Sequence, residues 1–331
     1  MSLNRSAEVL REDQSSFVDE SAPFVPNRKE PASAAVRTIE LRKDFRGTTA
    51  LSGLSMTVER GEVFGFLGPN GAGKTTAVKL LLGLVRPSGG EALVLGAPAG
   101  DRETRRRIGY LPELFRFQSW LTAAEVLMLH CRLIELPRGQ IGRAIDEALE
   151  TVDLTERRDD KVGTFSKGMQ QRLGLAVALV GEPELVILDE PTSALDPVGR
   201  HDVRVIIRGI RDRGATVFLN THLLEEAEHV CDRVTVIDRG RSLASGALRD
   251  LVGRTSSVRL KMAGFGDDCV RVIERFGDVV RDGEWISVAQ IQAEQIPLLV
   301  AEIVNVGGQI EAVIPEHQTL EERFLELLGK S

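Results

Sequence analysis

Hydrophobic residues change their spacing several times along the chain, and these changes predict where its elements lie. Residues 1–35 are polar, contain three prolines and show no sustained apolar period, which predicts a flexible tail. From residue 36 onward, the segments VRTIEL, LSMTV and EVFGFL have the length and apolar character of short β-strands. The last of them runs through a glycine-rich turn into the apolar segment TTAVKLLLGLV. We therefore expect a strand, a loop and a helix between residues 62 and 85.

Helical periods replace the strands between about residues 113 and 180, in LTAAEVLMLHCRLIEL and GRAIDEALETVDL. Strand character returns in ELVILD and ATVFLN, which indicates a helical insertion inside an α/β core. Residues 36–253 are therefore expected to form one domain.

A further change of pattern comes near residue 253. The segments that follow predict the order strand, helix, strand, strand, helix, strand, helix, in SSVRLKM, CVRVIERF, DVVR, WISVA, IPLLVAEIVNV, QIEAVI and LEERFLELL. The first six of these elements fit a split βαβ sandwich of the ferredoxin-like kind. Residues 254–331 are thus predicted to form a small α+β C-terminal domain.

The composition is that of a soluble globular protein, and its charge bears on the expected partners. A chain of 331 residues has room for one large α/β domain and a small appended one. The formal net charge of −7 supplies no general basic surface, so nucleic acid is not an expected partner. The apolar runs fall far short of the roughly 20 residues of a spanning helix, and the first residues lack the apolar core of a secretion signal.

The cysteines support the same setting. Cys131, Cys231 and Cys269 are widely separated and form no CxxC pair, which disfavours a disulfide framework or a zinc site. We expect a reducing, cytoplasmic environment.

A phosphate-binding pattern follows the third predicted strand. Gly68, Gly73, Lys74 and Thr75 fit G-x-x-x-x-G-K-[ST], in which glycines let backbone N–H groups wrap around phosphates. Lys74 is expected to reach the β- and γ-phosphates, and Thr75 to offer its hydroxyl to Mg²⁺. The strand before the loop and the helix after it are the context that this motif requires.

Two carboxylates and a histidine follow later strands. Asp189 and Glu190 end the apolar run ELVILDE; alone, such a pair would more often be a solvated turn. A P-loop nucleotidase, however, needs a second metal carboxylate, which Asp189 supplies, and a group that activates water, which Glu190 supplies. His222 follows the strand TVFLN, and ligands of parallel sheets bind where the strands end. The sequence therefore predicts that these side chains meet at the phosphate loop.

A second anion-ready helix start lies in TFSKGMQQRLG, residues 164–174. Ser166 is a good N-cap residue, Gly168 permits close backbone approach, and the positive end of the following helix points outward. Most such stretches are ordinary capped helices. A chain that holds one nucleotide would not need a second helix start of this kind.

Taken in this order, the motifs resemble those of the ATP-binding subunit of an ABC transporter. FSKGMQQR stands where that family has its signature LSGGQQR, and SALD at residues 193–196, after DEPT, matches its D-loop. The resemblance covers about residues 36–251. It implies a P-loop NTPase cassette with a RecA-like core, a β-subdomain and a helical subdomain. It also implies a head-to-tail dimer in which each signature helix completes the partner's ATP site.

The resemblance assigns roles residue by residue. Phe45 would stack on adenine, Glu190 would polarise the attacking water and His222 would sense the γ-phosphate. The other implied nucleotide contacts come from Gly68, Pro69, Asn70, Gly71, Ala72, Gly73, Lys74, Thr75 and Thr76. The implied contacts to the partner's ATP come from Ser166, Gly168 and Gln170, and the implied Mg²⁺ ligands are Thr75, Asp189 and Glu113.

Four residues in three motifs depart from the family pattern. Phe45 replaces a tyrosine, which keeps an aromatic face for stacking. Lys167 and Met169 replace a glycine and a glutamine of the signature. Glu113, in YLPE, replaces the usual glutamine; its carboxylate can ligate Mg²⁺ but also repels the γ-phosphate.

The resemblance implies an ATPase that powers transport through a separate membrane-spanning permease, on the cytoplasmic face of the membrane and as a homodimer or heterodimer. The tail HQTLEERFLELLG and the small domain before it look like the extension of ABC-2 type exporters, including drug-resistance pumps, so export is favoured. An importer ATPase with a regulatory C-terminal domain is an alternative. A soluble ABC ATPase acting on DNA or ribosomes is less favoured, because only about 115 residues separate Lys74 from Asp189 and the chain has one cassette. A catalytically weak regulatory module is also disfavoured, because the motif residues are all present.

Overall fold

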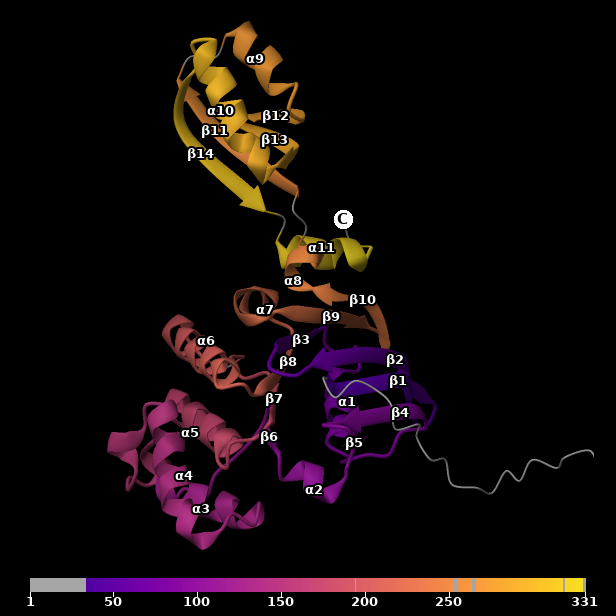
Figure 1. The fold of residues 1–331 in the computed structure, drawn as a ribbon, viewed down its shortest axis with the longest axis vertical. Helices are drawn as coiled ribbons and strands as arrows, with labels where there is room; N and C mark the ends of the chain where they lie inside the picture. Colours follow the sequence, from indigo (N-terminus) through magenta and orange to yellow (C-terminus); the bar gives the residue numbers. More distant parts are fainter. Residues whose placement is uncertain (1–33, 194, 253–254, 264–265, 318, 330–331) are drawn as a thin grey trace, which may run out of the picture. The chain divides into compact units, whose positions relative to one another are not determined.

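The computed structural model describes residues 34–193, 195–252, 255–263, 266–317 and 319–329 (Figure 1). The predicted N-terminal tail, apart from its last two residues, lies outside the described residues. The predicted domain boundary at residues 253 and 254 lies outside them as well.

A six-stranded sheet forms the centre of the large domain, in the order β10-β9-β3-β8-β7-β6. Its strands are β3 (Val63–Leu67), β6 (Ile108–Leu111), β7 (Leu185–Asp189), β8 (Thr216–Thr221), β9 (Arg233–Asp238) and β10 (Arg241–Ala247). All neighbours pair in parallel except β10, which is antiparallel to β9. The expected α/β core is therefore confirmed.

Two hydrophobic cores form on the two faces of this sheet, because successive side chains of a strand point to opposite faces. In the fully buried strand β7, Leu185 and Ile187 belong to one core, whereas Val186 and Leu188 belong to the other. The continuous apolar run ELVILD is the sequence of a strand covered on both faces.

A second, antiparallel sheet and one helix build the first of these cores. The strands lie in the order β2-β1-β4-β5 and span β1 (Ala34–Phe45), β2 (Thr48–Glu59), β4 (Gly89–Val94) and β5 (Ala97–Pro98). Helix α1 (Lys74–Leu81) buries Ala77, Val78, Leu80 and Leu81 in the same core. The short helix α2 (Arg102–Arg105) follows β5.

Helices build the second core. The predicted helical insertion contains α3 (Ala123–Leu133), α4 (Arg138–Thr151), the 3₁₀ turns Thr155–Arg157 and Val162–Thr164, and α5 (Lys167–Leu179). These helices pack against one another and, through α5, on β6 (Figure 1). The remaining helices of the large domain are α6 (Pro197–Asp212), α7 (Leu224–Val230) and α8 (Leu248–Leu251).

The small sandwich has the predicted order of elements. Its antiparallel sheet has the order β12-β13-β11-β14, from β11 (Thr255–Ala263), β12 (Asp278–Asp282), β13 (Trp285–Gln292) and β14 (Gln309–His317). Two helices, α9 (Asp267–Ile273) and α10 (Ile296–Asn305), with a 3₁₀ turn at Ala293–Gln295, complete its own hydrophobic core. This is the split βαβ arrangement.

The last helix, α11 (Leu320–Leu327), packs on the large domain. Leu320 is 1% exposed and belongs to the same core as Ala227 and Val230 of α7. Its backbone N–H also donates to Glu228 Oε2 over 3.3 Å. The sequence grouped α11 with the small domain because periodicity shows an apolar face but not what covers it. Within the described residues, no helix combines the length and hydrophobicity needed to span a membrane.

Replacing Leu320 with alanine should therefore destabilise the protein by about 2 kcal/mol or more, because a buried leucine loses its packing. Leu325→Ala on the same helix is the control, since Leu325 is 42% exposed and its loss should change stability by no more than about 0.5 kcal/mol. Urea denaturation measures both. Equal effects of the two substitutions would contradict the packing of α11 on α7.

Candidate functional site

A glycine-rich loop joins β3 to α1. Gly73, the residue before α1, has φ of 106°, and a Cβ there would lie 2.5 Å from the Ala50 carbonyl oxygen. Only glycine fits this position without displacing the backbone. No side chain caps the helix after Gly73, so the N–H groups of its first turn are available for an anion.

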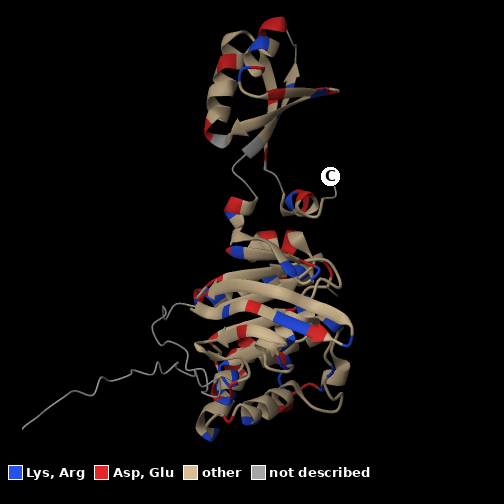
Figure 2. Ribbon diagram, turned by 90° about the vertical axis from the view of Figure 1, so that its right-hand side faces the viewer, with Lys and Arg blue, Asp and Glu red and all other residues tan. Residues whose placement is uncertain are grey.

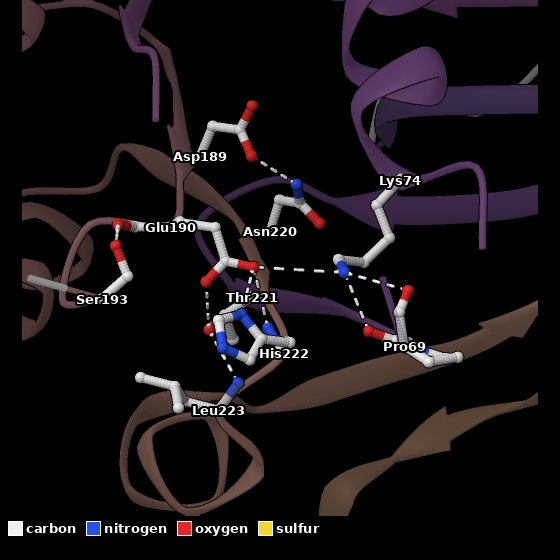
Figure 3. A network of polar contacts seen from close by, with 10 residues as sticks. Pro69, Lys74, Asp189, Glu190, Ser193, Asn220, Thr221, His222 and Leu223 are labelled. Atoms are coloured by element: carbon white, nitrogen blue, oxygen red, sulfur yellow. Dashed lines mark hydrogen bonds and ion pairs between the residues drawn. The ribbon is translucent and has the colours of Figure 1, made fainter. Parts of the chain in front are cut away.

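The side chain of Lys74 forms hydrogen bonds with the backbone at the start of this loop. Its Nζ donates to the carbonyl oxygens of Gly68 over 2.8 Å and Pro69 over 3.3 Å, and lies 4.0 Å from Glu190 Oε1 (Figure 3). Burial lowers the pKa of Lys74, while the nearby carboxylates of Glu190, Asp189 and Glu113 act in the opposite direction. The ammonium group is thus held between the loop and the carboxylates.

Asp189 ends β7 and pairs in register with Asn220 of β8. The Asn220 side-chain amide donates to Asp189 Oδ1, and Asn220 Oδ1 is buried without a hydrogen-bond partner in the described part of the chain (Figure 3). Burial raises the pKa of Asp189; the Asn220 hydrogen bond opposes this, and the charges of Glu113 and Glu190 add to it. A buried carboxylate of this kind gains from a cation. The unbonded amide oxygen of Asn220 beside it is a second oxygen ligand of the type that Mg²⁺ prefers.

Glu190 holds a strained backbone conformation, with φ of 51°. The Glu190 N–H donates to the Asn220 carbonyl oxygen over 2.8 Å, and the Ser193 hydroxyl donates to the Glu190 carbonyl oxygen over 3.2 Å. These bonds fix the turn in which β7 ends, and they direct the carboxylate toward β8.

The carboxylate of Glu190 binds the end of β8. Thr221 donates its hydroxyl to Oε2 over 3.1 Å, and the His222 backbone N–H donates to Oε1 over 3.0 Å. His222 Nδ1 also lies 2.7 Å from Oε1 (Figure 3). The predicted meeting of Lys74, Asp189, Glu190 and His222 is therefore what the structure contains.

The remaining predicted nucleotide and metal residues lie around this centre. Phe45 ends β1 with an exposed ring, and Lys43 Nζ lies 4.9 Å from its centroid. Thr75 is exposed and Thr76 half-buried in the first turn of α1. Glu113 is exposed just after β6, yet its charge raises the pKa of Asp189, which places it within electrostatic reach of the site. The loop positions between the end residues Gly68 and Gly73 are Pro69, Asn70, Gly71 and Ala72.

Ser166 and Gln170 of the signature segment make their side-chain hydrogen bonds within that segment. Ser166 caps α5, with the Met169 N–H donating to Ser166 Oγ over 3.2 Å, and Gln170 Nε2 donates to the Phe165 carbonyl oxygen over 3.2 Å. A Cβ on Gly168 would meet nothing within 4 Å. Among the described residues, none of these hydrogen bonds reaches the phosphate loop of the same chain.

Three contacting residues were missed from the sequence. Asn220 and Thr221 hold Asp189 and Glu190, and Gln171 donates from Nε2 to the Pro191 carbonyl oxygen over 2.7 Å, which ties α5 to the residue after Glu190. The polar ending of the apolar strand TVFLNT was the available signal for the first two. Gln171 carried no such signal, because its neighbour Gln170 is equally polar. In the described ranges, no cluster of three or more His, Cys, Asp or Glu side chains could hold a metal ion.

Comparison with known proteins decides the family. The model of the ABC transporter family matches residues 51–193. An uncharacterized ABC transporter ATP-binding protein (all4389) of Nostoc sp. (strain PCC 7120 / SAG 25.82 / UTEX 2576) is 39% identical over 308 residues, 90% of this chain and 90% of that protein. The chain belongs to the ABC transporter ATP-binding family.

Other members share most of the ABC cassette. Nod factor export ATP-binding protein I of Rhizobium sp. (strain N33) is 40% identical, covering 67% of this chain and 73% of that protein. Linearmycin resistance ATP-binding protein LnrL of Bacillus subtilis (strain 168) is 33% identical, covering 88% of this chain and 97% of that protein. The solved structure of an ATP-binding subunit of an ABC transporter matches with a TM-score of 0.60 and 32% identity, over 66% of this chain and 91% of that one.

ATP binding and ATP hydrolysis follow from this membership, and the fold is that of a P-loop ABC cassette. The cassette comprises the central sheet with the phosphate loop, the antiparallel β-subdomain and the helical subdomain described above.

Replacing Glu190 with glutamine should lower the turnover of ATP by about 100-fold or more while ATP affinity changes little, because the expected general base would be lost and the loop contacts would remain. Steady-state ATPase rates and equilibrium nucleotide binding measure the two effects. Glu225→Gln, an exposed carboxylate on α7, is the control and should be silent. Near-normal turnover in Glu190→Gln would refute the assignment of the base.

Proposed function

We propose that this subunit energises export through a separate membrane-spanning permease, working as a dimer of ATPase subunits on the cytoplasmic face of the membrane. The names of two relatives support export, since one is a Nod factor export protein and the other a linearmycin resistance protein. The exposed apolar surface of the helical subdomain carries the proposal of a permease partner.

The exposed apolar residues of the helical subdomain lie within a short stretch of sequence. Five exposed large apolar side chains lie between residues 114 and 133, namely Leu114, Trp120, Met128, Leu129 and Leu133, and Trp120 is 68% exposed. Several large apolar side chains exposed on one subdomain favour a protein partner. We propose that a cytoplasmic helix of the permease docks on this surface.

The site residues have separate roles in the proposed reaction. Lys74 and the first turn of α1 bind the phosphates, Phe45 stacks on adenine, and Glu190 accepts the proton of the attacking water while His222 holds the carboxylate in place. Asp189, Thr75 and Glu113 would hold Mg²⁺, which when bound neutralises phosphate charge. Glu113 brings a negative charge where the family commonly has a neutral amide. We infer that this weakens binding of the γ-phosphate relative to a glutamine.

The signature segment serves a second subunit in this proposal. Ser166, Gly168 and Gln170 would contact ATP that is held by the phosphate loop of the partner. Support comes from the start of α5, where Ser166 is exposed and no hydrogen bond of Ser166 or Gln170 in the described chain reaches the same chain's loop. Two such contacts would give two ATP sites per dimer.

Nucleic acid is not proposed as a partner. The net charge is −7, and basic and acidic segments are interspersed along the ribbon in the view of Figure 2. Binding to a nucleic-acid backbone generally relies on a basic stripe or patch.

Trp120→Glu and Leu133→Glu should each prevent association with the permease while ATP binding stays normal, because a charge would be buried at the docking surface. The measurement is copurification of the tagged full-length chain from native membranes in mild detergent. Val280→Glu, which alters an exposed apolar residue of the small sandwich, is the control and should copurify normally. A polytopic membrane protein that is lost only with the first two variants supports the proposal. Ribosomes or DNA bound to the unmutated chain would contradict it.

A further inference from the structure

An ion pair between a half-buried arginine and a buried glutamate lies beside the site but takes no part in the contacts described above. Arg204 on α6 donates from Nη1 to Glu226 Oε1 on α7 over 2.9 Å. Glu226 is 4% exposed, and its Oε2 has no hydrogen-bond partner within the described ranges. Because a buried charge such as that of Glu226 is costly to desolvate, replacing an ion pair of this kind by apolar residues of similar volume is often neutral or stabilising. Stability alone therefore does not account for the pair.

The position of the pair suggests another role. It lines a cavity of about 10 Å³ whose wall also contains Pro191, Thr192 and Thr221. Pro191 and Thr192 directly follow Glu190 in the sequence, and Thr221 directly precedes His222. The Thr221 hydroxyl donates to Glu190 Oε2, so a single side chain separates the cavity from the catalytic carboxylate.

The two helices joined by the pair both follow segments that leave the site. Helix α6 follows the turn that starts at Glu190, and α7 begins two residues after His222. A shift of α7 along α6 would move the His222 N–H and Nδ1, which lie 3.0 and 2.7 Å from Glu190 Oε1. A charged hydrogen bond has directional geometry, so it resists such a shift more than apolar packing does.

We propose that Arg204 and Glu226 are positioning residues for ATP hydrolysis. Their ion pair fixes α7 against α6 and thereby keeps His222 in contact with Glu190. The inference deepens the proposed roles of Glu190 and His222 and rests on them. Neither Arg204 nor Glu226 touches the nucleotide in this account.

The decisive experiment separates stability from turnover. Glu226→Gln removes the negative charge opposite the half-buried Arg204 and should lower both the stability of the protein and kcat. The double variant Arg204→Met/Glu226→Leu removes both charges and should recover most of the stability. Its kcat should nevertheless stay at least about 10-fold below normal, with ATP affinity within about threefold, because the loss is one of geometry during turnover. A double variant with normal stability and normal kcat would show that the pair is only structural and would overturn the proposal.

Arg208→Met is the matched control. Arg208 lies on the same helix and donates to the His229 carbonyl oxygen of α7 over 2.8 Å, but it is exposed. Its loss should leave kcat unchanged. If Arg208→Met lowers kcat as much as the double variant does, general contact between the helices matters and the proposed role of the pair fails.

A coupling measurement tests whether the pair acts through Glu190. In the Glu190→Gln background, the double replacement should lower the residual turnover by less than about threefold, because the carboxylate that it positions is already gone. Full additivity would contradict the proposal. If Glu190→Gln alone were silent, the proposed catalytic roles would fail first, which distinguishes the two outcomes.

Should the double variant not fold, Glu226→Asp tests the same idea. It keeps the charge but shortens the side chain by one methylene, so the ion pair must stretch or α7 must move. We expect kcat to fall by at least about fivefold with little change in ATP affinity. An unchanged kcat in the folded Glu226→Asp protein would overturn the proposal.

Discussion

Parallel strands bring their carboxyl ends to one edge of a sheet, and the site of this cassette depends on the register with which β3, β8 and β7 do so. Leu67 pairs with Thr221, and Asp189 pairs with Asn220, so the three strands end within one residue of one another. The turns that follow then deliver Lys74, Glu190 and His222 to one place, although they are far apart in the sequence. The strained backbone at Glu190 is held by the neighbouring strand, so the sheet also fixes the direction of the carboxylate.

Much of this arrangement could be predicted from the sequence, for local reasons. The strand, loop and helix around Gly68–Lys74 follow from apolar runs and from glycine positions. The continuous apolar run ELVILD indicates a strand that is buried on both faces. The sandwich at residues 255–317 showed each of its elements through periodicity. The rule that ligands bind where parallel strands end was enough to group His222 with the loop.

The other features of the site depend on tertiary contacts that the periodicity of the sequence does not predict. Asn220 matters because the register places it opposite Asp189, and Arg204 matters because α6 packs beside α7. Leu320 shows an apolar face in the sequence, but only the tertiary structure shows that α7 covers it. In each case the local pattern gives the type of side chain, whereas its partner is set by tertiary packing.

In the proposed dimer, one ATP site needs two copies of the chain, one supplying Lys74 and the other Ser166. The direct measurement mixes Lys74→Ala with Ser166→Arg, each inactive alone, and records ATPase activity at concentrations where the unmutated protein is dimeric. In half of the randomly formed dimers, one of two sites is rebuilt from intact parts, so the account predicts recovery of up to about a quarter of normal activity. A mixture no more active than the separate variants, with dimers demonstrably exchanging, would show that Ser166 serves its own chain and would contradict the account.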